Sequence, residues 1–184
     1  MVILMNNKIN INTWKEFLLK DLFIIERSKN ITLEAAEESL GNEIPYITRT
    51  EYNNGVNFFV SKDNFKIEKG NCITIGGEGA NVFYQPFDFI SGNNITKIYH
   101  SKLNENIWLF IVSILNLEKY RYSYNRAWNK KFIENTKINL PVDSQGNPDW
   151  QFMEEYIREL REREREFWTC SIIQLNKNKE NWLY

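Results

Sequence analysis

The chain contains the run Lys69-Gly70-Asn71-Cys72-Ile73-Thr74-Ile75-Gly76-Gly77-Glu78-Gly79, in which a β-rich segment lies between two turns. β-Branched residues favour strands, whereas Gly and Asn are typical of turns. The same alternation of short β-rich segments with Gly, Asn and Asp continues on both sides of this run. The expected strands are Cys72–Ile75 itself, Ile44–Thr50, Val56–Val60, Val82–Tyr84 and Ile95–Tyr99. Strands spaced this closely predict a twisted, mostly antiparallel sheet or a partial barrel.

Helices are expected on either side of these strands. Thr32 is suited to cap a short helix over Leu33–Glu38, and a longer helix is expected from about Glu105 to Tyr120, where apolar residues form one broad face. The segment Trp14–Ile25 can open as a short helical turn and continue as a strand, and its periodicity does not decide between the two. A short strand is expected at Ile138–Leu140. The prediction is therefore an α+β fold, a twisted sheet with packed helices.

The C-terminal part is predicted to be a long coiled-coil-type helix. Residues 143–148 have the composition of a turn or linker, so we place a boundary between a domain of residues 1–142 and a C-terminal segment of residues 143–184. Asp149 is suited to cap the helix. Apolar residues then recur at spacings of three and four, broken only at Glu164, and such a stripe predicts a surface for a partner or a second copy. The residues of this stripe are Trp150, Met153, Ile157, Leu160 and Phe167.

The net charge of −1 conceals an asymmetry along the chain. Between Lys97 and Lys137 the sequence has eight basic residues and three acidic ones, a local excess of +5, which leaves −6 for the remainder. A basic segment in a neutral chain indicates a localised surface for a polyanion, and a solvated surface of mixed charge is the alternative. Phosphate neutralisation by Lys and Arg supplies much of the affinity for DNA.

Export and membrane insertion are not predicted. The apolar start, Met1–Met5, is too short for the core of a signal peptide, and the apolar run Ile107–Leu115 is far shorter than the roughly 20 residues of a membrane span. Cys72 and Cys170 lie far apart, so neither a zinc site nor a disulfide framework is suggested. A cytoplasmic location is expected.

The usual signatures of catalysis are missing from the sequence. His100 is the only histidine, and the sequence has no phosphate-binding Gly-x-x-x-x-Gly-Lys-Ser/Thr loop. Gly76–Ala80 lacks the last glycine of a dinucleotide-binding loop, so a turn that brings backbone close to a partner is the preferred interpretation. The sequence also has no Pro-Pro and no acidic residue followed two positions later by lysine. We therefore expect a non-catalytic chain that needs neither metal nor cofactor.

Three segments carry side chains suited to reading DNA. Base edges in the major groove are read by Arg and Lys on guanine, by Asn and Gln on adenine and by Glu on the amino group of cytosine. The segments are the end of the strand that begins at Ile44, the turn from Gly76 to Asn81, and the aromatic and basic stretch from Tyr120 to Lys131. The candidate DNA contacts are Thr48, Arg49, Thr50, Glu78, Asn81, Arg121, Tyr124, Arg126, Trp128, Asn129, Lys130 and Lys131.

The order of four segments resembles a known family. They are residues 14–23 (WKEFLLKDLF), 44–50 (IPYITRT), 67–76 (IEKGNCITIG) and 137–142 (KINLPV), followed by a long charged helix. In this order they resemble the target-recognition domains of type I restriction-modification specificity subunits and of their relatives in type IIG and IIB systems. Each segment is moderately specific, and the resemblance covers nearly the whole chain.

The resemblance implies a function in double-stranded DNA recognition. Members of the family read one half of a bipartite site, and a long helix sets the distance to a second domain and docks the methyltransferase subunit. S-adenosylmethionine would belong to that subunit, and a restriction subunit is a further implied partner. Because family members carry two domains and two helices, this chain is expected to pair with a copy of itself or with a second specificity chain. The alternatives are a coiled-coil interaction protein and a small nuclease with an unrecognised site.

Overall fold

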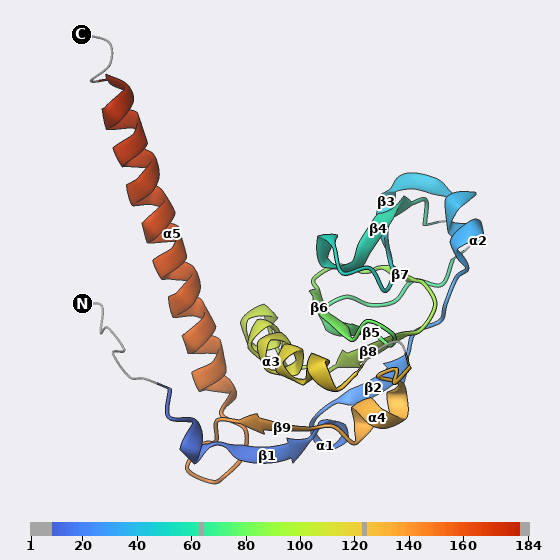
Figure 1. Ribbon diagram of the computed structural model, residues 1–184, viewed down its shortest axis with the longest axis horizontal. Helices are drawn as coiled ribbons and strands as arrows, with labels where there is room; N and C mark the ends of the chain where they lie inside the picture. The colour runs from blue at the N-terminus through green and yellow to red at the C-terminus, as the bar shows by residue number, and fades with distance from the viewer. Residues whose placement is uncertain (1–8, 63–64, 123–124, 181–184) are drawn as a thin grey trace.

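The computed structural model describes residues 9–62, 65–122 and 125–180. Within these residues the strands form three sheets, with most pairs antiparallel, and helices pack against them (Figure 1). The expected α+β fold with a twisted, mostly antiparallel arrangement and a long C-terminal helix is confirmed.

The central sheet has four antiparallel strands in the order β2 (Ile24–Arg27), β8 (Ile95–Tyr99), β5 (Cys72–Gly76) and β6 (Asn81–Gln85). β5 is buried along its whole length, and its β-branched residues Ile73, Thr74 and Ile75 favour the strand conformation. β5 and β6 form a hairpin in which Gly76 is paired with Asn81. Gly76 is also paired with Ile95, the first residue of β8. The turn of the hairpin and the loop between β7 and β8 therefore lie at the same end of the strands.

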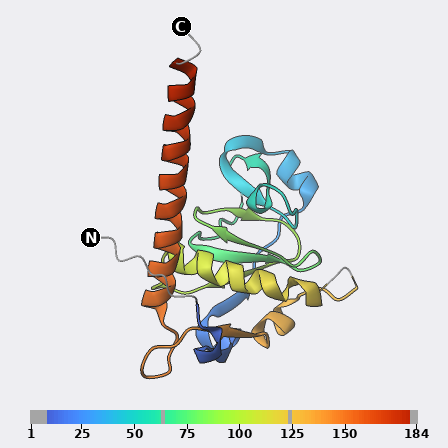
Figure 2. The same cartoon turned by 60° about the vertical axis from the view of Figure 1, so that its left-hand side comes forward.

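Helix α3 (Glu105–Glu118) lies across the central sheet (Figure 2). Asn104 caps the helix, because its side-chain oxygen accepts a hydrogen bond from the backbone N–H of Ile107 at 3.2 Å. The apolar face of α3, with Trp108, Ile111 and Leu115 fully buried, forms the main core together with the strands. The short 3-10 helix η3 (Lys119–Arg121) continues from its end.

A smaller sheet has the order β4 (Val56–Val60), β3 (Leu40–Ile47) and β7 (Ile90–Ser91), with β3 and β7 parallel. Together with α2 (Leu33–Glu37) it has a core of its own. Figure 1 shows this sheet and helix beside the central sheet. The expected strand at Ile44–Thr50 starts earlier and ends at Ile47. Residues 48–50 therefore belong to a loop, which is where groups that contact a ligand are commonly carried. The short 3-10 helix η2 (Asn53–Gly55) precedes β4.

The two ends of the globular part are joined by the pair β1 (Lys15–Leu18) and β9 (Lys137–Leu140). The segment that fitted either a helical turn or a strand contains both, since α1 (Leu19–Leu22) lies between β1 and β2, and the 3-10 helix η1 (Ile11–Thr13) precedes β1. α4 (Lys130–Glu134) and β7 are elements that the sequence pattern did not predict.

The long helix α5 (Trp150–Glu180) begins against the globular part and then projects from it (Figures 1 and 2). Met153 is fully buried in the main core, and Trp150 and Ile157 pack against it. Arg161 is held to α3 by a hydrogen bond to Asn106 at 2.9 Å. The first half of the expected partner stripe therefore packs within this chain, and the core continues across the boundary expected after residue 142.

Farther along α5 the apolar residues Leu160 and Phe167 are exposed, at 41% and 66% of their surface. Trp168 is exposed as well, at 59%. The part of the stripe that is open to a partner thus starts at Leu160. No helix in the described ranges has the length and apolar character needed to cross a membrane.

Candidate nucleic-acid interface

Segments distant in the sequence meet around a cleft of about 250 Å³. One wall is the turn between β5 and β6, with Gly77 and Glu78, and another is the stretch that leads into α4. Two of the three segments selected from the sequence are thus brought together. The remaining wall comes from the end of β2 and from the loop before β8. The lining residues are Arg27, Gly77, Glu78, Asn94, Thr96, Ala127, Trp128, Asn129, Lys130 and Lys131.

Backbone hydrogen bonds fix the β5–β6 turn against both neighbouring segments. The N–H of Gly77 donates to the carbonyl of Asn94 at 3.0 Å, and the carbonyl of Gly77 accepts from the N–H of Trp128 at 2.7 Å. Gly76 packs closely on the loop after β3, since a Cβ atom there would lie 3.3 Å from the Cα of Arg49. The interpretation of this turn as a close backbone approach is consistent with that geometry.

A chain of four polar side chains runs along the rim of the cleft. The guanidinium group of Arg27 donates to Asn94 Oδ1 at 2.7 Å, and Asn94 Nδ2 donates to Glu78 Oε1 at 3.2 Å. The other carboxylate oxygen of Glu78 forms an ion pair with Arg49. About a third of the Glu78 and Arg49 side chains is exposed. This row links the β5–β6 turn to the loop after β3, which is the one selected segment that does not line the cleft.

Lys130 and Lys131 begin helix α4 at the edge of the cleft. Asn129 caps this helix through its side-chain oxygen, which accepts from the N–H of Phe132 at 3.2 Å. Lys130 lies 3.3 Å from Glu134 one turn later, and both lysines are solvent-exposed. Two exposed lysines at the mouth of a cleft, Lys130 with its ion-pair partner Glu134 and Lys131 beside it, suit contacts to phosphate.

Thr48 and Thr50 line a neighbouring hollow of about 280 Å³ together with Arg49 and Asn93. Thr48 Oγ1 accepts from the N–H of Thr50 at 3.4 Å, which shapes the loop. Arg49 lines this hollow while its ion-pair partner Glu78 lines the cleft, so the pair lies where the two meet.

Two of the selected residues are buried and hold the structure together. The indole of Trp128 is fully buried, stacks on Tyr122 and donates from Nε1 to Thr136 Oγ1 at 3.0 Å. Asn81 is 8% exposed, and its side-chain amide donates to the carbonyl of Arg49 at 3.1 Å and accepts from Lys119 at 2.6 Å. These contacts occupy both side chains, so the expectation that they touch DNA is corrected and they are not part of the surface proposed below.

The other selected residues lie at the end of α3 and beyond it. Arg121 is paired with Glu118 at 2.9 Å and with the hydroxyl of Tyr120 at 2.9 Å, and it does not line the cleft. Arg126 is exposed. Tyr124 lies outside the described residues.

The selection from the sequence missed Arg27, Asn93 and Asn94. Residues 92–94 were interpreted only as a turn, and Arg27, which follows the segment Trp14–Ile25, was given no role. The pairing of β2 with β8 places them together, with Arg27 opposite Thr96. Polar residues at the ends of two strands would have been the signal, but the pairing of those strands was not known from the sequence.

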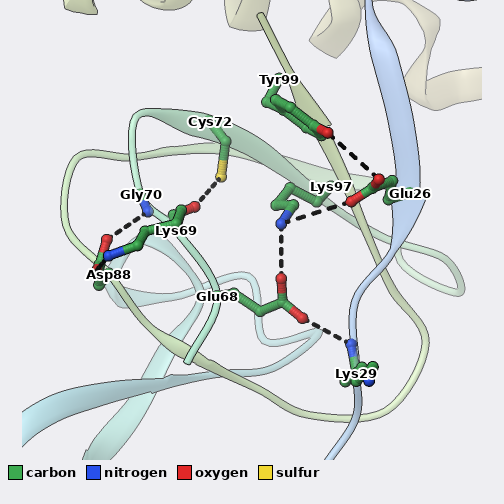
Figure 3. A network of polar contacts seen from close by, with 9 residues as sticks. All are labelled: Glu26, Lys29, Glu68, Lys69, Gly70, Cys72, Asp88, Lys97 and Tyr99. Carbon is green, nitrogen blue, oxygen red and sulfur yellow. Dashed lines mark hydrogen bonds and ion pairs between the residues drawn. The ribbon is translucent and has the colours of Figure 1, made fainter. Parts of the chain in front are cut away.

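A buried ion pair supports the segment that follows Arg27 (Figure 3). Glu68 Oε2 lies 2.7 Å from Lys97 Nζ, and Glu68 Oε1 accepts from the N–H of Lys29 at 2.9 Å. The next residue, Asn30, donates from its side chain to Asn93 at 2.6 Å. The connection from β2 to α2 is thus held to β8 through Glu68 and Lys97. Among the described residues no group of three or more His, Cys, Asp or Glu side chains is arranged to bind a metal ion.

Mixed sheets, short loops gathered around a basic cleft and a long helix docked beside them fit the class of target-recognition domains that the sequence resembles. Residues 11–166 match the family described as the type I restriction modification DNA specificity domain, and the chain belongs to that family. The resemblance seen in the sequence is thereby confirmed.

The relatives include the specificity subunit S.BcgI of the type II restriction enzyme BgcI of Heyndrickxia coagulans. The two are 34% identical over 159 residues, which are 85% of this chain and 45% of that subunit. The fold is shared with the S subunit of a type I system from M. genitalium, at a TM-score of 0.55 and 17% identity over 88% of this chain and 43% of that one.

It is also shared with the HsdS subunit from Thermoanaerobacter tengcongensis, at a TM-score of 0.58 and 13% identity over 82% of this chain and 38% of that one. The chain thus spans less than half the length of each of these relatives.

Proposed function

We propose that this chain reads a specific double-stranded DNA sequence, one half of a bipartite site, and directs a partner methyltransferase or endonuclease to it. In this proposal the chain acts in the cytoplasm and is itself non-catalytic. S-adenosylmethionine belongs to the methyltransferase, and a restriction subunit joins the same assembly. Membership in the family of specificity subunits supports the proposal.

The observation that carries the proposal is the cleft at the ends of β2, β5 and β8. Base readout requires donors and acceptors on loops that a rigid scaffold holds in place. Arg27 and Asn129 are such groups. A hydrogen bond to Asn94, which Glu78 holds in turn, fixes Arg27, and Asn129 is fixed as the cap of α4. The exposed lysines of α4 at the same cleft supply charge for the phosphate backbone.

The test is selection of bound sequences from a randomised duplex library by the purified full chain. A single enriched motif supports the proposal, and it should match the bases that become methylated when the chain is combined with its partner methyltransferase. Enrichment of no motif, or methylation that is independent of the chain, contradicts it.

The phosphate contribution is tested with Lys130→Ala/Lys131→Ala. Each lost phosphate contact should lower the slope of log affinity against log salt concentration by about 1, and affinity should fall by the same factor for all sequences. The matched control is Lys62→Ala, an exposed lysine paired with Glu43 beside β3 and outside the cleft. Its salt slope should equal that of the unchanged chain.

The second candidate function is assembly through α5 without DNA recognition. The exposed side chains of Leu160, Phe167 and Trp168 favour a role for this helix in association. Both functions predict association with a copy of this chain, with a second specificity chain or with the methyltransferase. They differ in the selection experiment, where only the first predicts an enriched motif. Metal-dependent cleavage of DNA by the chain alone would instead indicate a nuclease.

A further inference from the structure

The row formed by Arg27, Asn94, Glu78 and Arg49 joins two guanidinium groups through a carboxamide and a carboxylate. Each inner side chain is bound on both sides. Asn94 accepts from Arg27 and donates to Glu78, and Glu78 accepts from Asn94 with one oxygen and pairs with Arg49 through the other. The direction of each guanidinium group is therefore set from within the protein.

The backbone holds the row at its centre. The carbonyl of Asn94 accepts from the N–H of Gly77, the residue before Glu78, at 3.0 Å, so the same two segments are joined through backbone and side chains. Asn94 has a positive φ of 58°, a conformation that Asn tolerates better than most residues. The turn that carries Glu78 thus has little freedom relative to Asn94.

The carboxylate distinguishes this row from a phosphate-binding site. A carboxylate beside a guanidinium group cancels its charge and repels phosphate, so the Arg49–Glu78 pair adds little to the attraction for the DNA backbone. The same carboxylate holds the planar guanidinium in one orientation, which helps it to form two hydrogen bonds to one acceptor edge. Guanine, with O6 and N7, is the base edge that fits this donor pair.

We propose that Arg49 and Arg27 each read a guanine in the recognised sequence, and that Glu78 and Asn94 are positioning residues that fix the two guanidinium groups. The inference rests on the proposed function and makes it more specific. It also assigns Glu78 a different role from the one expected from the sequence, because its oxygens are used to hold Arg49 and Asn94 and do not accept from cytosine.

The experiment is the same selection from a duplex library, carried out with the full chain and with Arg49→Ala and Arg27→Ala. Each variant should lose the preference for guanine at one position, a different position for each, and bind the original motif about 10- to 100-fold more weakly. Affinity for unrelated duplexes and the salt slope should stay the same for the double variant Glu78→Gln/Arg49→Ala, because the pair that it removes is neutral overall. Far-UV circular dichroism and thermal unfolding verify that each variant is folded.

The positioning role is tested with Glu78→Gln and with the double variant Glu78→Gln/Arg49→Ala. Glu78→Gln should weaken the preference for guanine at the Arg49 position only, and by less than Arg49→Ala. The double variant should match Arg49→Ala, since the carboxylate acts through the arginine. An effect of Glu78→Gln on cytosine preference at another position, or an additive loss in the double variant, overturns this role.

The outcomes separate the inference from the function on which it rests. If the unchanged chain enriches no motif, the proposed function fails and this inference fails with it. If it enriches a motif that Arg49→Ala and Arg27→Ala leave intact, only the inference is overturned. The inference is also overturned if Arg49→Ala weakens binding equally for all sequences and lowers the salt slope, because Arg49 would then contact phosphate.

Discussion

Lys97 Nζ lies 2.7 Å from Glu68 Oε2 inside the protein, with 10% and 9% of the two side chains exposed. Removing one partner of a buried pair leaves an uncompensated charge. Glu68→Gln should therefore lower the free energy of unfolding by about 3–5 kcal/mol, measured by urea denaturation. The control is Glu43→Gln at the exposed pair with Lys62, where a change below about 1 kcal/mol is expected. Equal effects of the two substitutions would contradict a structural role for the buried pair.

The same pair predicts a dependence of stability on pH. Burial alone would raise the pKa of Glu68, but hydrogen bonds from Lys97 and from the N–H of Lys29 outweigh it, and the pKa lies below its usual 4.5. The stabilisation is therefore complete above pH 4.5 and is lost as the pH falls toward the lowered pKa. The difference in unfolding free energy between the unchanged chain and Glu68→Gln should narrow in this acid range. A difference that stays constant throughout the acid titration would disprove the assignment.

Trp128→Phe tests whether the buried indole serves the fold. The substitution removes the hydrogen bond to Thr136 and leaves that buried hydroxyl with one partner fewer, so stability should fall by about 1–3 kcal/mol. The motif enriched from a duplex library should not change, because the side chain is fully buried. Thr136→Val is the matched variant, since it removes the other end of the same bond. A changed base preference with unchanged stability would place Trp128 at the DNA.

Met153 and Leu160 should separate folding from association along α5. Met153 is fully buried, so Met153→Ala should cost about 2–5 kcal/mol of stability. Leu160 is 41% exposed, so Leu160→Asp should change stability by no more than about 0.5 kcal/mol and still weaken association. Thermal unfolding and light scattering measure the two properties. Association that is unchanged in Leu160→Asp would show that the partner surface lies elsewhere.

The two cysteines should differ in reactivity. Burial raises the pKa of the Cys72 thiol to about 12, whereas Cys170 is exposed on α5. Because the thiolate is the reactive form, a maleimide should modify Cys170 in the native chain and reach Cys72 only after unfolding. Mass spectrometry of digested samples identifies the modified residue. Slower modification of Cys170 in a mixture with the methyltransferase would locate that partner on α5.

Much of the fold was predictable because its strands are short and strongly patterned. The expected strands Val56–Val60 and Ile95–Tyr99 have these bounds in the structure, and the helix expected at Glu105 starts there. β7 has only two residues and exists through its parallel pairing with β3, so no local signal predicts it. α4 was not predicted, because the stretch Tyr120–Lys131, in which it begins, was interpreted only by its charge and its aromatic residues.

The sequence predicted which segments form the candidate site, but it predicted the individual residues less well. Glu78, Asn129, Lys130 and Lys131 were selected and line one cleft. A tryptophan next to basic residues suits both a DNA surface and a core, and only the packing of Tyr122 and Thr136 on Trp128 distinguishes the two.

The pairing of β1 with β9 has a consequence for how the chain is made. Lys137 donates to Glu16 across 121 positions of sequence, so this contact forms only after almost the entire globular part has been synthesised. Contacts of such separation form slowly, because a long loop must close before they contribute.

The start of α5 follows β9 by a short turn and rests on the same core. The helix therefore gains its fixed direction only when both ends of the recognition domain have met. If α5 carries the proposed partner surface, a chain whose two ends have not met would present that surface in no fixed direction, and assembly would favour chains whose proposed DNA-reading cleft is already formed.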